Sequence, residues 1–476
     1  MGTAIPGNVP DMMAPDVAAE LAHEIPQGEA AAHHLAVATP DQPWPAAGAA
    51  YYALAVIIFA TFLNFFDSAA FGLLIEQIKT EFHLSNTAIG LLQGPVNVVF
   101  YMVVMLPLSR CSDIYPRKYV LAVGALLIAL LNATGGFTST FMALAFTRML
   151  VGAGGGAHAP GAYSMLADFF PPEKRRWPFA LLQLGFIGGG TIGLVIAGRM
   201  LAAAMAMPAM DLGFVTLHGW KYVLLMLAVP GVVACLLLLL MKEPPRRGGI
   251  TAGAKPMPIK TVFAEMYRRR AVYGPLFLAL GFSTAHAMAL PAWMTPFFKR
   301  TYGWTEIDIA ARAPLFMLAG QLAGLVVGPL LIKTLASRYR DANIRAVVLC
   351  MGLAMPLGIV APMMPSPWLA LACMSVSGML GIMGAVPQNL IIQEITPNQM
   401  RGQVTGLYLM MFTAVGAVGP FMVGFLTDTV FGSDGDVWKA MVLLAAVLSP
   451  AAVFTMSRAV KPYGAALDML EAAPRG

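Results

Sequence analysis

Residues 222–241, YVLLMLAVPGVVACLLLLLM, form an uninterrupted run without a charged side chain. A helix rises about 1.5 Å per residue, so about 20 apolar residues cross the hydrocarbon core of a bilayer. Because backbone groups in lipid must pair within their own segment, such a run is predicted to be a transmembrane helix. From Tyr51 onward the sequence contains twelve predominantly apolar segments, at 51–75, 88–108, 118–138, 140–168, 178–200, 222–241, 272–294, 312–333, 345–364, 367–392, 403–427 and 437–457. The sequence therefore predicts an all-α membrane protein with twelve transmembrane helices.

The composition excludes a soluble fold. Of 476 residues, 58% are hydrophobic and 11% are charged, whereas a soluble domain carries about 25% charged residues. The four cysteines stand in or beside apolar runs at no regular spacing, which is typical neither of a disulfide framework nor of a zinc site. The net charge of +6 comes from basic residues scattered through short loops, so nucleic acid is not an expected partner.

The basic residues predict the topology. With residues 1–50 in the cytoplasm, about 22 of the 30 lysines and arginines lie on the cytoplasmic side, which agrees with the positive-inside rule. Residues 1–50 contain no lysine or arginine and are rich in alanine and proline, which predicts a mostly disordered tail. We expect a protein of the bacterial inner (cytoplasmic) membrane with both termini in the cytoplasm.

The longest polar connection, residues 242–271, divides the twelve helices six and six. It predicts a cytoplasmic linker between an N-terminal bundle at 51–241 and a C-terminal bundle at 272–460, with a cytoplasmic tail at 461–476. The bundles repeat each other at an offset of 226 residues, which pairs Asp168 with Glu394, Pro171 with Pro397, Arg175 with Arg401, and Gly190, Gly193 and Gly198 with Gly416, Gly419 and Gly424. Duplicated six-helix bundles are a transporter architecture, with a substrate site between them near the midplane.

The loop between the second and third predicted helices, SRCSDIYPRK at 109–118, resembles the G-x-L-A-D-R-x-G-R-K signature of the major facilitator superfamily. Within that superfamily the chain is similar to spinster-type transporters, in stretches such as LNFFDS at 63–68, RMLVGAGGGAHAP at 148–160 and RGQVTGLYLMMFTAVGAVGPFMVGFLTD at 401–428. The resemblance implies the major facilitator fold. Together with the repeat it implies a conformational switch at the cytoplasmic helix ends, formed by Asp113, Arg117, Lys118, Asp168, Arg175, Glu394 and Arg401.

Two positions depart from the spinster pattern. That family typically carries an Asp-Arg pair in helix 1, where this chain has Asp67 followed by Ser68. In helix 4 it carries Arg-x-x-x-Gly-x-Gly-Glu, and here Arg148 is retained whereas Gly155 replaces the glutamate. The proton-coupled mechanism that the resemblance implies would have to work without these two charges. The sequence leaves open whether and how protons are coupled.

Ionisable side chains inside the spans are the candidate functional residues, since each costs at least about 2.5 kcal/mol at the bilayer centre. We expect Asp67 and His158 to couple protons; the alternative for Asp67 is a packing role. Arg148 is expected to pair with Asp67 or to hold an anionic group of the substrate, and the alternative is a structural link between helices. The other residues expected to line the cavity are Asn64, Phe66, Tyr101, Gln183, His286, Gln321, Gln388 and Tyr408. For the two histidines the alternative is a core position with satisfied hydrogen bonds.

Two further features concern helix shape. The stretch ALPAWMTP at 289–296 predicts a break near the outer end of helix 7, and Trp293 and Phe297 either belong to a gate there or lie at the membrane interface. The repeated glycines of helices 5 and 11 are expected to let backbones approach closely. Bending of these helices during transport is the alternative.

No enzyme signature is present: GGITAGAK at 248–255 lacks the adjacent Gly-Lys and following Ser or Thr of a phosphate loop. We expect no cofactor and no ATP-driven step. The expected function is secondary active transport of an amphipathic organic anion, lysolipid-like compounds included, by alternating access with proton coupling. The alternatives are a passive facilitator or lipid exporter without proton coupling, and a transport-incompetent sensor with the same fold. We expect a monomer in contact with membrane lipids; substrate identity and direction do not follow from the sequence.

Overall fold

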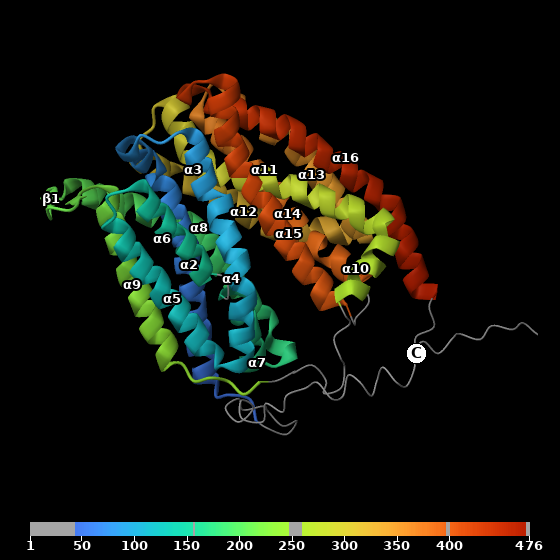
Figure 1. The fold of residues 1–476 in the computed structure, drawn as a ribbon. Helices are drawn as coiled ribbons and strands as arrows, with labels where there is room; N and C mark the ends of the chain where they lie inside the picture. Colours follow the sequence, from blue (N-terminus) through green and yellow to red (C-terminus); the bar gives the residue numbers. More distant parts are fainter. Residues whose placement is uncertain (1–42, 156–157, 247–258, 397–399, 473–476) are drawn as a thin grey trace, which may run out of the picture.

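The computed structural model describes residues 43–155, 158–246, 259–396 and 400–472, and these are almost entirely helical (Figure 1). Within them, eleven helices are long and apolar enough to cross a membrane. The fourth predicted helix corresponds to two shorter ones, α6 (Phe141–Gly155) and α7 (His158–Phe169). Each of the twelve predicted segments therefore coincides with helical structure, and the all-α prediction is confirmed. Residues 1–42 of the tail that is predicted to be disordered lie outside the described residues.

The N-terminal half contains the first six predicted segments. Its other helices are α2 (Ala47–Phe82), α3 (Asn86–Gln93), α4 (Pro95–Ile114), α5 (Arg117–Gly136), α8 (Arg176–Ala206) and α9 (Trp220–Leu240). α3 and α4 together form the second segment. A 3-10 turn, η2 (Pro172–Lys174), precedes α8, and two short antiparallel strands, β1 (Met210–Asp211) and β2 (Thr216–Leu217), lie between α8 and α9.

The C-terminal half contains the other six segments. They are α11 (Arg270–Tyr302), α12 (Glu306–Ala336), α13 (Ala342–Val360), α14 (Pro367–Ile395), α15 (Arg401–Leu426) and α16 (Val437–Ala472), with short turns η3 (Ala361–Met363), η4 (Thr427–Phe431) and η5 (Asp434–Asp436). The linker contains a helix that the sequence analysis did not predict, α10 (Ile259–Arg268). Val262 and Met266 are four residues apart, so they lie on one face of this helix, and both pack onto the C-terminal core. α16 continues beyond the predicted helix end at 457, through most of the segment predicted as a tail.

The predicted break in helix 7 is wrong. α11 runs without interruption past Pro291 and Pro296. Each proline removes one backbone hydrogen bond, but the helix is fixed by its neighbours, since Trp293 and Phe297 are fully buried. Nε1 of Trp293 donates to the carbonyl oxygen of Pro420 in α15 over 2.8 Å. Trp293 and Phe297 therefore lie in the core and not at the membrane interface.

The 226-residue repeat is visible in the packing of two glycines. A Cβ placed on Gly198 of α8 would lie 2.3 Å from the Cβ of Ala310 in α12. A Cβ on its repeat partner, Gly424 of α15, would lie 2.2 Å from the carbonyl oxygen of Asn86 in α3. Both contacts join one half of the molecule to the other. The packing role predicted for these glycines is confirmed, because no larger residue fits at either contact.

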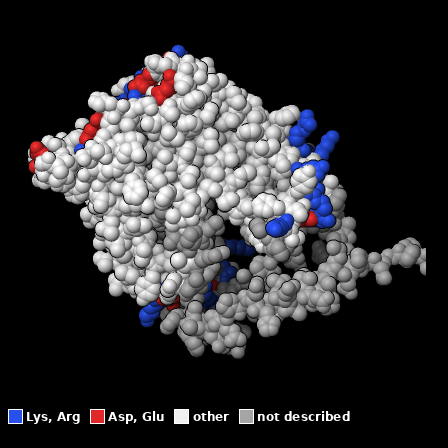
Figure 2. All heavy atoms as spheres, in the orientation of Figure 1, with Lys and Arg blue, Asp and Glu red and all other residues white. Residues whose placement is uncertain are grey.

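The two halves lie side by side and meet at the end remote from the linker (Figure 1). We call that end the far end, and the end that carries α10 and the described termini the linker end. At the far end α8 packs against α12, and α3 packs against α15. Charged residues on the face in Figure 2 gather near the helix ends and leave an uncharged band between them, and the surface is hollowed between the halves toward the linker end.

Candidate functional site

A carboxylate, an amide and a guanidinium meet inside the N-terminal half. Asp67 lies on α2, Asn132 on α5 and Arg148 on α6, and 6%, 2% and 4% of their surfaces are exposed. Nδ2 of Asn132 donates to Oδ1 of Asp67 over 2.7 Å, and Nη1 of Arg148 lies 3.4 Å from Oδ2 of Asp67. Nη2 of Arg148 donates to Oδ1 of Asn132. The structure thus brings Asp67 and Arg148 together, with Asn132 bound to both.

The surroundings of Arg148 determine how firmly this pair is held. A buried ion pair is favourable only when additional hydrogen bonds offset the loss of water, and Asn132 supplies one to each partner. The ring of Phe71 lies 4.7 Å from the guanidinium carbon, which adds a cation–π contact. Nε of Arg148 is buried and has no hydrogen-bond partner among the described residues. Arg148 therefore retains a donor for a further acceptor.

A polar cavity of about 250 Å³ lies beside the pair. Both charged side chains reach it, and so does the predicted residue Tyr101 of α4. Thr413 of α15 also lines it, so the cavity touches both halves. The remaining lining residues are Asn64, Ser68, Phe71, Leu92, Gln93, Val98, Ile128, Val151, Gly152 and Gly155.

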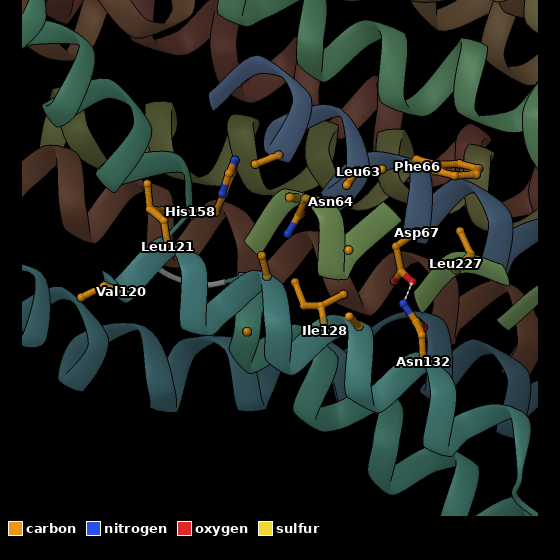
Figure 3. A pocket seen from close by; sticks show the side chains of 16 residues that line it. Leu63, Asn64, Phe66, Asp67, Val120, Leu121, Ile128, Asn132, His158 and Leu227 are labelled. Carbon is orange, nitrogen blue, oxygen red and sulfur yellow. Dashed lines mark hydrogen bonds between the residues drawn. The ribbon is translucent and has the colours of Figure 1, made fainter. Parts of the chain in front are cut away.

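A smaller cavity, of about 40 Å³, lies within the N-terminal half (Figure 3). Its polar lining comes from Asn64, Asp67, Asn132 and His158, and much of the rest is small or aliphatic. Nε2 of His158 lies 2.8 Å from Oγ1 of Thr61. The two residues predicted to couple protons, Asp67 and His158, therefore line the same cavity.

The two positions that depart from the spinster pattern both adjoin Asn64. A Cβ on Gly155 would lie 2.9 Å from Nδ2 of Asn64, and Oγ of Ser68 lies 3.5 Å from the backbone oxygen of Asn64. A glutamate at position 155 would have to displace the amide of Asn64. The space beside Gly155 is therefore filled by the uncharged amide of Asn64.

A cavity of about 540 Å³ lies between α8 and the helices of the C-terminal half. The predicted residues His286, Gln321 and Gln388 line it, and the rest of the wall is largely apolar. Nδ1 of His286 lies 3.0 Å from Oγ of Ser449, whereas its Nε2 is buried without a partner among the described residues. Methionines give this wall a polarisable surface: Met294, Met317, Met351, Met355 and Met374.

Three predicted lining residues lie elsewhere. Phe66 is buried against Gly193 of α8 and borders only the 40 Å³ cavity. Gln183 is exposed and accepts a hydrogen bond from the Tyr163 hydroxyl over 3.0 Å. Tyr408 is buried and accepts a hydrogen bond from Nε2 of Gln388 over 2.6 Å. Tyr408 thus supports a cavity residue and does not itself border these cavities.

The predicted switch residues of the N-terminal half fasten three helices at the linker end. Arg117, at the start of α5, is buried; its Nη1 lies 2.6 Å from Oδ2 of Asp168 in α7, and its Nε lies 3.2 Å from Oε1 of Glu243 after α9. Glu243 also accepts the backbone N–H groups of Arg117 and Lys118 over 3.0 Å each, which caps α5. Arg175 donates to the carbonyl oxygens that end α7.

The C-terminal half repeats this arrangement with less charge. At the offset of 226 residues Arg117 corresponds to Asn343 and Asp168 to Glu394, and Nδ2 of Asn343 donates to Oε1 of Glu394 over 2.8 Å. The hydroxyl of Tyr463 donates to Oε2 of the same carboxylate. The side chains of the two other predicted switch residues, Asp113 and Arg401, lie outside the described part of the structure.

An ion pair that the sequence analysis did not predict joins the halves at the far end. Nη2 and Nε of Arg300 in α11 lie 2.6 and 3.3 Å from the two carboxylate oxygens of Glu76 in α2. Nη1 of Arg300 donates to Oδ1 of Asn86 over 2.8 Å. Both charged side chains are about nine-tenths buried, with 8% and 10% of their surfaces exposed. The contact is therefore shielded from solvent and geometrically specific.

A carboxylate of the C-terminal half caps a helix of the N-terminal half. Asp428 of η4 accepts the backbone N–H of Thr87 over 2.7 Å and that of Asn86 over 3.2 Å, at the start of α3. A negative charge is favourable at that end of a helix. Lys79 of α2 pairs with Asp434 of η5. We call the residues of these contacts the far-end seal: Glu76, Lys79, Asn86, Arg300, Asp428 and Asp434.

Comparison with known proteins places this chain in a family. The sequence profile described as Major Facilitator Superfamily matches residues 57–420. The chain belongs to the major facilitator superfamily. It is 25% identical over 417 residues to an MFS-type efflux pump of Mycolicibacterium smegmatis, covering 86% of this chain and 90% of the relative. It is 23% identical over 402 residues to Protein spinster of Drosophila melanogaster, covering 80% of this chain and 62% of the relative.

A solved structure shows the same fold. A bacterial homolog to the human lysosomal transporter Spinster, in an inward-facing and unoccupied conformation, matches with a TM-score of 0.71 at 19% identity, covering 89% of this chain and 98% of that chain. The predicted twelve-helix fold and the resemblance to spinster-type members are confirmed. As a member of the major facilitator superfamily the protein is an integral membrane protein and a secondary transporter of a small molecule, and not an enzyme.

Sequence analysis missed Asn132 and the far-end seal. Asn132 had a signal, because a lone amide in the apolar segment 118–138 needs a hydrogen-bond partner in lipid. Glu76 and Arg300 are visible as charges near the ends of two spans, but nothing in the sequence pairs residues so far apart. The buried charges at the centre of this major facilitator protein can therefore be recognised in the sequence. The contacts at its far end can be recognised only in the structure.

Proposed function

We propose that this transporter carries amphipathic organic monoanions, lysolipid-like compounds among them, across the bacterial inner membrane by alternating access, and that protonation of Asp67 is coupled to binding of the anion. The observation that carries the proposal is the buried pairing of Asp67 with Arg148 beside the polar cavity of about 250 Å³. A single chain forms both bundles, so a monomer is sufficient.

The pairing makes Asp67 and an anionic substrate competitors for one guanidinium. A guanidinium binds a carboxylate or phosphate through parallel hydrogen bonds, but Asp67 and Asn132 already occupy both Nη atoms of Arg148. Protonation of Asp67 removes its negative charge and leaves a buried cation, which is unfavourable until another anion pairs with it. One proton and one monoanion therefore enter together, and the net charge of the site is unchanged.

The different chemistry of the two halves supports an amphipathic substrate. Arg148 is the one lysine or arginine among the residues that line the 250 and 540 Å³ cavities, so the site matches one acidic group. The wall of the larger cavity offers apolar and thioether surface. Because apolar burial contributes about 25 cal/mol per Å², affinity should rise with chain or ring size at constant charge.

The basic loops support a cytoplasmic position for the linker end and both termini. In that orientation the far-end seal closes the outer side, and the hollow between the halves opens inward (Figure 2). Alternating access then requires the seal to break while the halves approach each other at the linker end.

A facilitator without proton coupling is the second candidate. Ser68 and Gly155 favour it, because they remove two charges that spinster-type members carry, and the group that fills the space beside Gly155 is the uncharged amide of Asn64. Such a facilitator would move the same anions but would not concentrate them in response to a pH gradient.

Uptake into proteoliposomes tests the proposal. Alkanesulfonates are suitable because they stay ionised and do not cross the bilayer as neutral acids. We expect an imposed pH gradient, acidic outside, to drive their accumulation, with rates that rise with chain length, and we expect an alkylammonium of matched length and a neutral sugar to be excluded. Arg148→Lys should weaken transport and Arg148→Ala should nearly abolish it. Transport of the cation or the sugar, or undiminished transport by Arg148→Ala, would refute the proposal; equal uptake with and without the gradient would favour the facilitator.

A further inference from the structure

The charged site continues into the N-terminal half along one face of α2. Thr61, Asn64 and Asp67 follow one another at intervals of three residues, so their side chains are neighbours on the helix surface. At about 1.5 Å per residue, Thr61 and Asp67 stand about 9 Å apart along the axis. Figure 3 shows Asn64 between His158 and Asp67 on the wall of the 40 Å³ cavity. The cavity thus joins the acid at the substrate site to a histidine nearer the linker end.

Hydrogen bonds determine which nitrogen of His158 carries the proton. The hydroxyl of Thr61 donates its one hydrogen to the carbonyl oxygen of Ile57 over 2.7 Å. Its oxygen can then only accept from Nε2 of His158, 2.8 Å away. The neutral ring is therefore protonated at Nε2, and Nδ1 is a free acceptor that has no partner among the described residues.

The cavity has room and polar partners for water. One water molecule needs a cavity volume of roughly 10–15 Å³, so the cavity of about 40 Å³ holds about three water molecules. At about 2.8 Å per hydrogen bond, a chain of three water molecules spans about 11 Å, which exceeds the axial rise of about 9 Å between Asp67 and Thr61, the hydrogen-bond partner of His158. Asn64 and Asn132 offer donors and acceptors along the way.

Few charged groups face this space. α2 contributes Asp67, and α6 contributes Arg148, which pairs with Asp67 from the side of the polar cavity. α5 and α9 contribute Asn132 and uncharged residues such as Leu227. Among the residues that line the 40 Å³ cavity, Asp67 and His158 are the two whose side chains carry an acid or base group that can exchange a proton.

We propose that His158 takes up the proton of Asp67 through this cavity, so that the proton and the substrate leave the site by different routes. The inference rests on the proposed coupling at Asp67. The carboxylic acid gives its proton to a cavity water, and a water gives a proton to Nδ1 of His158, whose Nε2–H stays bound to Thr61. Asp67 regains its charge, pairs with Arg148 and displaces the anion. The imidazolium then returns the proton on Nδ1 to water, which restores the neutral ring with its hydrogen on Nε2.

The test measures proton entry with a pH dye trapped in proteoliposomes while an alkanesulfonate is supplied outside. His158→Gln keeps a side-chain donor but cannot accept a proton, and we expect it to slow substrate-dependent acidification by at least about tenfold. His83→Gln makes the same change at an exposed position on the far end, and it should acidify as the parent does. Thr61→Val removes the acceptor that fixes the tautomer and should slow acidification, whereas Thr61→Ser, which keeps the hydroxyl, should not.

The outcomes separate this inference from the proposed function. If Asp67→Asn abolishes coupled acidification but His158→Gln does not, the relay is refuted and the coupling at Asp67 stands. If Asp67→Asn acidifies as the parent does, the proposed function itself fails. Loss of sulfonate-induced thermal stabilisation in His158→Gln would show that the variant damages the substrate site, and would also overturn the relay.

Discussion

Nδ2 of Asn132 lies 2.7 Å from Oδ1 of Asp67, and among the described residues this amide is the one neutral partner that Asp67 shares with Arg148. Asn132→Ala would leave a buried carboxylate and a buried guanidinium each short of one hydrogen bond. We expect the free energy of unfolding to fall by about 1–3 kcal/mol per group, measured by denaturant titration in detergent. Asn389→Ala, which removes an exposed amide from α14, is the control and should change stability little. Equal stabilities of the two variants would contradict the role given to Asn132.

The ion pair between Glu76 and Arg300 is expected to hold the far end closed. Arg300→Ala should raise the fraction of molecules that are open at that end, because a buried Glu76 loses its partner. The measurement is the rate at which a membrane-impermeant maleimide, added from the far-end side, labels Thr413→Cys in the polar cavity, in a chain whose four native cysteines are replaced by serine. Labelling should accelerate severalfold.

The double variant Glu76→Ala/Arg300→Ala controls for the charge that a single change leaves unpaired. If the pair acts as one unit, the double variant should label more slowly than the sum of the two single effects predicts, whereas two independent residues would give that sum. An unchanged labelling rate in all three variants would show that this ion pair does not govern access.

A substitution at Gly424 tests the close approach of the two halves by changing side-chain size instead of charge. A methyl group there would lie 2.2 Å from the carbonyl oxygen of Asn86, so Gly424→Ala should keep α15 away from α3 and favour the state that is open at the far end. Gly352→Ala in α13, where nothing lies within 4 Å of the added carbon, is the matched control. The same labelling assay should respond to the first change and not to the second.

The repeat provides a comparison at the linker end. Asp168 faces the buried cation of Arg117, whereas Glu394 faces the neutral amide of Asn343. We expect Asp168→Asn to lower the free energy of unfolding by about 1–3 kcal/mol, since Arg117 keeps Glu243 as a second partner. Glu394→Gln should lower the free energy of unfolding by a smaller amount. A larger loss in Glu394→Gln, measured by the same titration, would contradict this account of the two halves.

Much of the fold could be predicted from the sequence, because it follows from properties that are local. The twelve apolar runs show where helices cross lipid, and the offset that pairs Gly198 with Gly424 shows that the bundles are related. The break expected at Pro291 was wrong for a reason the local sequence does not contain: the aromatic side chains around it are buried by other helices.

The candidate site could be predicted in part. Asp67 and Arg148 can be recognised in the sequence because charges are rare in the spans. An ion pair between them is the simplest way to give each buried charge a partner. Asn132 was not predicted because one amide hardly changes the hydropathy of its segment. The contact of Glu76 with Arg300 depends on how the two bundles meet, which is a property of the access state and not of either segment.

The most direct test of the central claim, that protonation of Asp67 frees Arg148 for an anion, is the affinity for an alkanesulfonate as a function of pH. The ligand stays ionised, so any pH dependence belongs to the protein. If each anion binds together with one proton, the Kd should rise by up to about tenfold per pH unit once Asp67 is ionised in the free protein, and Asp67→Asn should bind tightly at every pH. A parent Kd that does not change with pH, or the same slope in Asp67→Asn, would contradict the account.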